Sequence, residues 1–105
     1  MRTIPFEASE YEEAYVGGAN GLSIERGKDK LTITVKQNFP TSGYTMNVRE
    51  ITEKDGILTV HLDLIYPKPD AIVLQVIAYG KQIIEINNKD LGEFPQFYKL
   101  AIYIP

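Results

Sequence analysis

The sequence predicts an all-β fold, a two-sheet β-sandwich of seven to eight mostly antiparallel strands. Apolar and polar residues alternate with a period of two through most of the chain, which is the pattern of half-buried strands. Turn sequences with glycine, proline and aspartate separate these segments at nearly regular spacing, as in sandwiches and barrels. The length of 105 residues suits a single domain, residues 1–105, that can bury a core without disulfides or metal.

The composition excludes several classes of function. The net charge of −3 gives no global attraction to nucleic acid or to an anionic membrane. No apolar run approaches the ~20 residues of a membrane span, and no signal-peptide pattern precedes Ile4. The chain has no cysteine, which excludes a disulfide framework, thiol catalysis and cysteine-ligated zinc. We therefore expect no cofactor, no nucleic-acid partner and no membrane insertion.

Residues 7–15 are the one helix candidate, and the sequence leaves two alternatives open for them. The segment reads EASEYEEAY and is followed by Gly17 and Gly18, which can end a helix. Its apolar positions fit a helical stripe only weakly, so it is either a short N-terminal helix or an irregular edge segment. The glycine-rich residues 17–21 predict a flexible bend, because a phosphate-binding loop would lead into a helix and this one leads into a strand at Leu22.

Three central segments carry the clearest alternation. Their apolar faces are Leu31, Ile33 and Val35; Tyr44, Met46 and Val48; and Leu58, Val60, Leu62 and Leu64. A polar turn at 26–30 precedes the first of them. Between the second and the third, Asp55-Gly56 predicts a tight hairpin, because this dipeptide suits the positive φ angles of two-residue turns. Each strand can therefore pack one face and expose the other.

The C-terminal part begins with a break and continues with apolar strands. Residues 66–70, YPKPD, hold two prolines that cannot donate to a ladder, so the chain leaves the sheet there. Residues 72–79, IVLQVIAY, are apolar on both faces apart from Gln75 and predict a more central strand. The remaining elements are strands at 82–86 and 97–105 and a loop at 87–95. The apolar last strand and residues 72–79 leave pairing through a sheet edge open, and with it the oligomeric state.

The bend that joins the first two central segments is the candidate binding site. Its residues are Phe39, Pro40, Thr41, Ser42, Gly43 and Tyr44. A proline ends the preceding strand, the two hydroxyl side chains can bond to nearby backbone, and the glycine permits a positive φ. A simple strand connection needs the same features. A rigid bend with an aromatic on each side also suits a protein-binding tip, because it loses little entropy on docking.

The other polar residues fit structural roles better than catalytic ones. His61, the single histidine, shares a strand face with Asp63. A Ser-His-Asp triad would also need a serine beside it, and the candidates are Ser9, Ser23 and Ser42. No nucleophile-elbow pattern is present, and the carboxylates lack the spacing of a calcium loop. We expect neither catalytic residues nor metal ligands.

Three stretches carry a family resemblance: PTSGYTMNVREITEKDGILTVHLDL, YPKPD and VLQVIAYGKQIIEI. Together, over residues 40–86, they resemble the C-terminal domain family of PrcB, a subunit of a bacterial protease complex. Ser42 stands where the family's bend usually has its first glycine, and residues 78–81 lack the proline that usually follows. The resemblance implies a module that associates with or stabilises a protease, outside the cytoplasm or at the cell surface.

The same bend is similar to the Asn-Pro-Thr-Thr-Gly-Tyr loop of chagasin-type cysteine-protease inhibitors, which are immunoglobulin-like sandwiches. Here Phe39 separates Asn38 from Pro40. The family's second loop, with closely spaced glycines, is not found after residue 60, and its Arg-Pro-aromatic loop is replaced by EFPQF at 93–97.

We therefore expect an immunoglobulin-like β-sandwich that is not an enzyme and binds a protein, in particular a protease or its complex, through the bend. A chagasin-like protease inhibitor is one alternative. A second alternative is a carbohydrate-binding domain that uses exposed tyrosines, and a third is a structural surface domain in which the bend is only a turn. The candidate tyrosines are Tyr44, Tyr66, Tyr79, Tyr98 and Tyr103.

Overall fold

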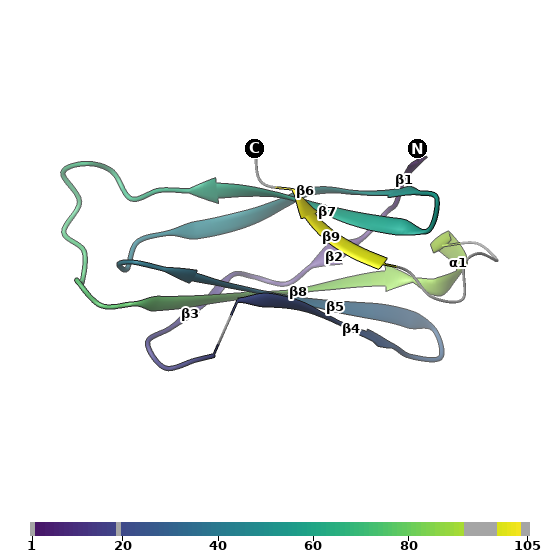
Figure 1. Ribbon diagram of the computed structural model, residues 1–105, viewed down its shortest axis with the longest axis horizontal. Coiled ribbons are helices and arrows are strands. Elements are labelled where there is room, and N and C mark those ends of the chain that lie inside the picture. Colours follow the sequence, from purple (N-terminus) through teal and green to yellow (C-terminus); the bar gives the residue numbers. More distant parts are fainter. Residues whose placement is uncertain (1, 19, 92–98, 104–105) are drawn as a thin grey trace.

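The computed structural model describes residues 2–18, 20–91 and 99–103, and it confirms the β-sandwich (Figure 1). These ranges contain nine strands and one short helix: β1 (Arg2–Thr3), β2 (Glu7–Ala8), β3 (Glu12–Ala14), β4 (Gly21–Arg26), β5 (Lys30–Phe39), β6 (Thr45–Lys54), β7 (Ile57–Ile65), β8 (Ala78–Asn87), α1 (Asn88–Leu91) and β9 (Lys99–Tyr103). The number exceeds the seven to eight expected because the N-terminal segment contributes three strands of two or three residues. No helix in the described ranges is long and apolar enough to cross a membrane.

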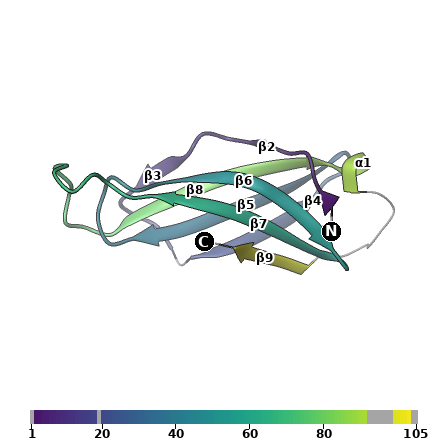
Figure 2. The ribbon, with the colours of Figure 1, turned by 90° about the horizontal axis from the view of Figure 1, so that it is seen from above.

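The strands form two sheets that lie face to face (Figures 1 and 2). One sheet has the order β1-β6-β7-β9, and the other has the order β2-β8-β5-β4, with β3 also paired to β8. All pairs are antiparallel except β7 with β9, which are parallel. Residues 92–95 of the predicted loop at 87–95 lie outside the described residues, as do residues 97–98 and 104–105 of the predicted last strand at 97–105.

The core lies between the two sheets and confirms the predicted apolar faces of the central strands. Its buried members are Ile4, Leu31, Ile33, Val35, Met46, Val48, Ile51, Leu58, Val60, Leu62, Ile84, Ile86 and Leu91. Leu64 and Leu22 are partly buried against it. The alternation breaks once, at Arg49, because Val48 pairs with Leu62 while Glu50 pairs with His61, which makes Arg49 the extra residue of a β-bulge. The bulge lets both Val48 and Ile51 point inward.

The β6–β7 hairpin closes on Asp55 and Gly56, as the sequence predicts. Their φ angles are 52° and 82°, the left-handed values that such two-residue turns require.

Replacing Gly56 with alanine is expected to lower the free energy of unfolding by about 1 kcal/mol, because a Cβ is disfavoured at positive φ. Urea unfolding measures the change. Lys54→Ala, in the exposed last residue of β6, is the control and should stay within about 0.5 kcal/mol of wild type. Equal losses in both variants would show that the turn conformation does not cause the effect.

The prediction of a helix over 7–15 is wrong, and the alternative of an irregular edge segment is right. β2 pairs with Ile84 and Glu85 of β8, and β3 pairs with residues 79–81 of the same strand. Backbone pairing along this edge therefore replaces helical hydrogen bonds. Between the two short strands, Tyr11 packs against the core over Gly80, where an added Cβ would clash with the Tyr11 hydroxyl.

The prediction of a central strand over 72–79 is also wrong. Residues 71–77 form no strand, and β8 begins only at Ala78, running through Gly80 into the predicted strand at 82–86. The reason lies in the neighbouring strand: Ala78 pairs with Phe39, the last residue of β5, and Pro40 follows. Residues before Ala78 therefore have no continuation of β5 with which to pair.

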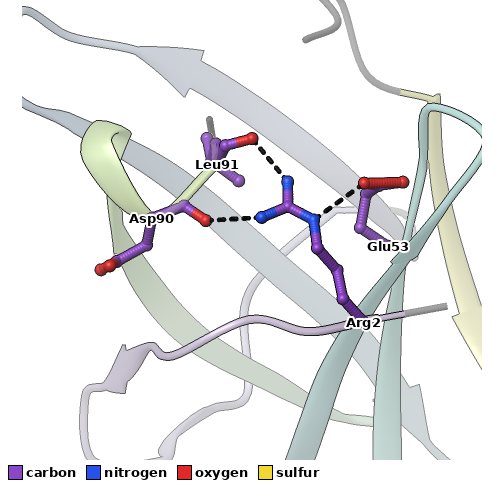
Figure 3. A network of polar contacts seen from close by, with 4 residues as sticks. All are labelled: Arg2, Glu53, Asp90 and Leu91. Atoms are coloured by element: carbon purple, nitrogen blue, oxygen red, sulfur yellow. Dashed lines mark hydrogen bonds and ion pairs between the residues drawn. The ribbon is translucent and has the colours of Figure 1, made fainter. Parts of the chain in front are cut away.

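Arg2 ties the N-terminus to both the hairpin and the helix (Figure 3). Its Nε lies 3.0 Å from the Glu53 carboxylate, and its guanidinium donates to the backbone carbonyls of Asp90 and Leu91. These carbonyls end α1, where the backbone has no partner within the helix. The bond from Arg2 holds the pKa of Glu53 below its ordinary value.

The Arg2–Glu53 pair is expected to add stability above pH 4.5 and to lose it in acid. A carboxylate whose pKa is lowered in the folded state stabilises it above the unfolded value of 4.5, and this contribution disappears as the pH falls through the folded value. The free energy of unfolding is measured with urea from pH 7 to pH 3 for wild type and Glu53→Gln. The difference between the two should become smaller in acid. The same substitution at exposed Glu10 serves as control, and a difference that stays constant with pH at position 53 would contradict the role of the pair.

Candidate functional site

Two loops meet at one end of the sandwich, on the left of Figure 1. Residues 40–44 connect β5 to β6, and residues 66–77 connect β7 to β8. Each loop crosses from one sheet to the other. The opposite end carries the polar turn between β4 and β5, where Gly27 N donates to Lys30 O at 2.8 Å.

The shorter loop braces the longer one. Ser42 N donates to Leu74 O at 3.1 Å, and Leu74 N donates to Ser42 Oγ at 2.7 Å, so both backbone groups of Leu74 are fixed by one residue. Gly43 has a φ of +91°, and a Cβ placed on it would lie 3.0 Å from Pro67 Cβ and 3.1 Å from Val73 Cγ1. A glycine is therefore needed at 43 both for the backbone conformation and for the close approach of the other loop.

Three aromatic rings continue this packing. Phe39 and Tyr44 stack with their centroids 4.8 Å apart and their planes 5° apart. Tyr66, at the start of the longer loop, packs edge-on against Tyr44, with the two ring centroids 5.4 Å apart. Offset or edge-on aromatic pairs of this kind contribute roughly 0.5–1.5 kcal/mol beyond the area that they bury. The rings thus join β5, the bend and the longer loop into one rigid unit.

Outside this brace, the longer loop and the strand end before it expose a set of apolar side chains. We call this set the apolar tip, and its members are Ile65, Tyr66, Ile72, Leu74, Val76 and Ile77. Ile72 is 102% exposed and therefore makes almost no contact within the chain. The charged side chains between 65 and 77 are Lys68 and Asp70, whose charges cancel. Clustered apolar side chains on a soluble protein commonly mark an interaction surface.

Tyr15 brings the N-terminal segment to the same end. Its hydroxyl donates to Glu13 Oε1 at 2.9 Å, and that bond raises the pKa of Tyr15 above its ordinary value. The residue before it, Ala14, pairs with Tyr79 near the start of β8, which lies at this end of the sandwich. About half of the Tyr15 side chain remains exposed.

The predicted site residues are brought together, but most of them face inward. Phe39 is 4% exposed and Ser42 is 9% exposed, while Thr41 and Tyr44 are half-buried. Only Pro40 and Gly43 are exposed. The direct contact of these residues with a partner stays a prediction. The exposure of residues 72–77 was not predicted, because their apolar run, broken only by Gln75, is also typical of a central strand.

The remaining polar candidates have structural contacts. His61 Nε2 lies 2.9 Å from Thr52 Oγ1, and Asp63 lies 3.7 Å from Arg49. Ser42 is engaged with Leu74, as described above. Within the described part of the chain, no group of three or more histidine and carboxylate side chains is placed to hold a metal ion.

Comparison with known families and proteins gives one match. Residues 37–87, just under half of the chain, match the model of the PrcB C-terminal family, which confirms the resemblance read from the sequence. The matched segment runs from the end of β5 to the end of β8 and contains both the bend at 40–44 and the apolar tip. Neither the curated proteins nor the solved structures contain a match to the chain.

Proposed function

Because residues 37–87 carry the pattern of the PrcB C-terminal family, we propose that this chain is a non-catalytic module that associates with a protease complex and stabilises it. The apolar tip is the proposed contact surface. The observation that carries the proposal is the exposure of Ile72 and its neighbours on a loop whose backbone is fixed by Ser42. A fixed loop loses little conformational entropy on docking, and its apolar side chains gain by leaving water.

A protein surface suits the apolar tip better than an anionic lipid surface does. Only Lys68 adds positive charge to residues 65–77, and Asp70 offsets it. Binding to anionic lipid relies on clusters of lysine and arginine, about 1 kcal/mol for each one. Desolvated pockets of a partner protein instead accept single large apolar or aromatic side chains as anchors.

Inhibition of a cysteine protease by the bend is the second candidate. The burial of Phe39 and Ser42 disfavours it, because a loop that enters a cleft must present its side chains. The two functions differ in their effect on the protease. A stabilising module lengthens the lifetime of the enzyme at 37 °C without lowering its turnover, whereas an inhibitor lowers turnover at once.

The proposal is tested by site-specific crosslinking in lysate and culture medium of the source organism. A photoreactive amino acid replaces Ile72 in one sample and exposed Lys28, in the turn at the opposite end, in the other. We expect a protease or a subunit of its complex to crosslink at 72 and not at 28. The same proteins at both positions, or no protease-complex subunit at 72, would overturn the proposed contact surface.

A further inference from the structure

A cavity of about 240 Å³ lies against the sheet of β8 and β5, on the side away from the core, under the turn that follows β3. Gly17 and Gly18 form one wall, and the polar and aromatic lining comes from Glu12, Lys36, Asn38, Tyr79 and Lys81. Lys36, Tyr79 and Lys81 occupy positions between inward-facing residues of their strands. We call this cavity the lysine pocket; the apolar tip does not contribute to it.

The two lysines form a like-charge pair. Lys36 and Lys81 are direct partners in the β5–β8 ladder, which brings cross-strand Cβ atoms to roughly 5 Å. Two like charges in such a position destabilise a sheet unless an anion lies between them. Lys81 Nζ is 3.4 Å from a carboxylate oxygen of Glu12, whereas no salt bridge forms at Lys36 within the described residues. The three side chains therefore carry one net positive charge.

The walls of the pocket are held in place before any ligand binds. A Cβ on Gly17 would lie 2.7 Å from Tyr79 Cγ, so only a glycine lets the turn approach the ring this closely. Asn38 Nδ2 donates to Gly18 O at 3.2 Å, and Asn38 N is hydrogen-bonded to the Asn20 side chain. The turn is thereby fastened to β5. A preformed concave site with an aromatic wall and a few polar groups is typical of small-ligand sites.

We propose that the lysine pocket binds an acidic sugar unit, a six-membered ring that carries one carboxylate. The carboxylate bridges Lys36 and Lys81 and relieves their repulsion, and the apolar face of the ring packs against Tyr79. Glu12 disfavours a ligand of higher negative charge, because the pocket supplies one net positive charge. A neutral sugar would leave Lys36 without a counter-charge.

The test is a titration of the ¹⁵N-labelled chain with glucuronate, glucose and sulfate, followed by amide chemical shifts. We expect glucuronate to shift the amides of Gly17, Gly18, Lys36 and Lys81, and glucose and sulfate to leave them nearly unchanged. Lys36→Gln should weaken glucuronate binding about tenfold, the usual effect of losing one charge-assisted hydrogen bond. Lys28→Gln is the matched control at the far turn and should not change the affinity.

Three results would overturn the proposal. If sulfate shifts these amides as much as glucuronate does, the pocket is a site for an adventitious ion only. Equal shifts with glucose would remove the role of the carboxylate. If glucuronate causes no shift at concentrations on the order of 10 mM, its dissociation constant is too high for a specific site, and the proposed site does not exist. Lys36 is exposed, so its substitution does not threaten the fold.

Discussion

Ile72→Asp is expected to weaken binding to the protease complex by about 30-fold or more while leaving the fold intact. The side chain is 102% exposed, so its replacement removes no packing within the chain. The free energy of unfolding should therefore stay within about 0.5 kcal/mol of the wild-type value. In the complex, an aspartate would place an unpaired charge in an apolar contact. Loss of an anchor side chain at an interface typically costs about 2 kcal/mol or more, which is the 30-fold change.

Binding is measured as the amount of protease complex retained by increasing concentrations of immobilised chain, and stability by urea unfolding. Ile57→Asp is the control, because Ile57 is an isoleucine that is 41% exposed and lies at the far hairpin, where β7 begins. It should retain the complex as wild type does. If Ile72→Asp binds as well as Ile57→Asp, the apolar tip is not the contact surface, whatever the partner is.

The sequence was sufficient to predict the structure where apolar and polar residues alternate strictly and the structure depends only on residues close in sequence. The faces of Leu31, Ile33 and Val35 and the hairpin at Asp55-Gly56 follow from side-chain period and turn chemistry, which are properties of a few adjacent residues. The bulge at Arg49 did not follow, because it depends on which residues of β7 stand opposite. Local pattern does not contain that register.

The two wrong predictions, a helix over 7–15 and a central strand over 72–79, have the same cause. Residues 7–15 take the form of edge strands because β8 offers an open edge, and residues 72–77 stay out of the sheet because β5 ends at Phe39. In both cases a strand distant in sequence decides the outcome. An almost wholly apolar segment such as 72–77 is typical of a central strand and equally of an exposed apolar loop, so composition alone could not separate the two.

The same reason explains the partial prediction of the site. The bend at 40–44 was identified from its proline, hydroxyl side chains and glycine, and the structure brings these residues together. Its packing against Pro67, Val73 and Leu74 spans about thirty residues of sequence and was not visible. The bend therefore holds the exposed loop in place, and in the proposed function it would act on a partner only through that loop.

Gly43→Val is expected to damage both folding and binding, in contrast to Ile72→Asp. A β-branched residue is strained at a φ of +91°, and its Cβ would lie 3.0 Å from Pro67 and 3.1 Å from Val73. The strain and the crowding together should lower the free energy of unfolding by about 2–4 kcal/mol. Since the crowded atoms belong to the loop that carries Ile72, the loop must shift, and retention of the protease complex should fall even where the variant is fully folded.

Gly18→Val is the matched control, because an added Cβ there meets nothing within 4 Å. Urea unfolding should place it within about 0.5 kcal/mol of wild type. If Gly43→Val and Gly18→Val have the same free energy of unfolding, the two loops do not pack as closely at Gly43 as the structure shows. If instead Gly43→Val is destabilised but retains the complex fully at temperatures where it is folded, the bend only supports the fold, and the partner does not require the braced position of the loop.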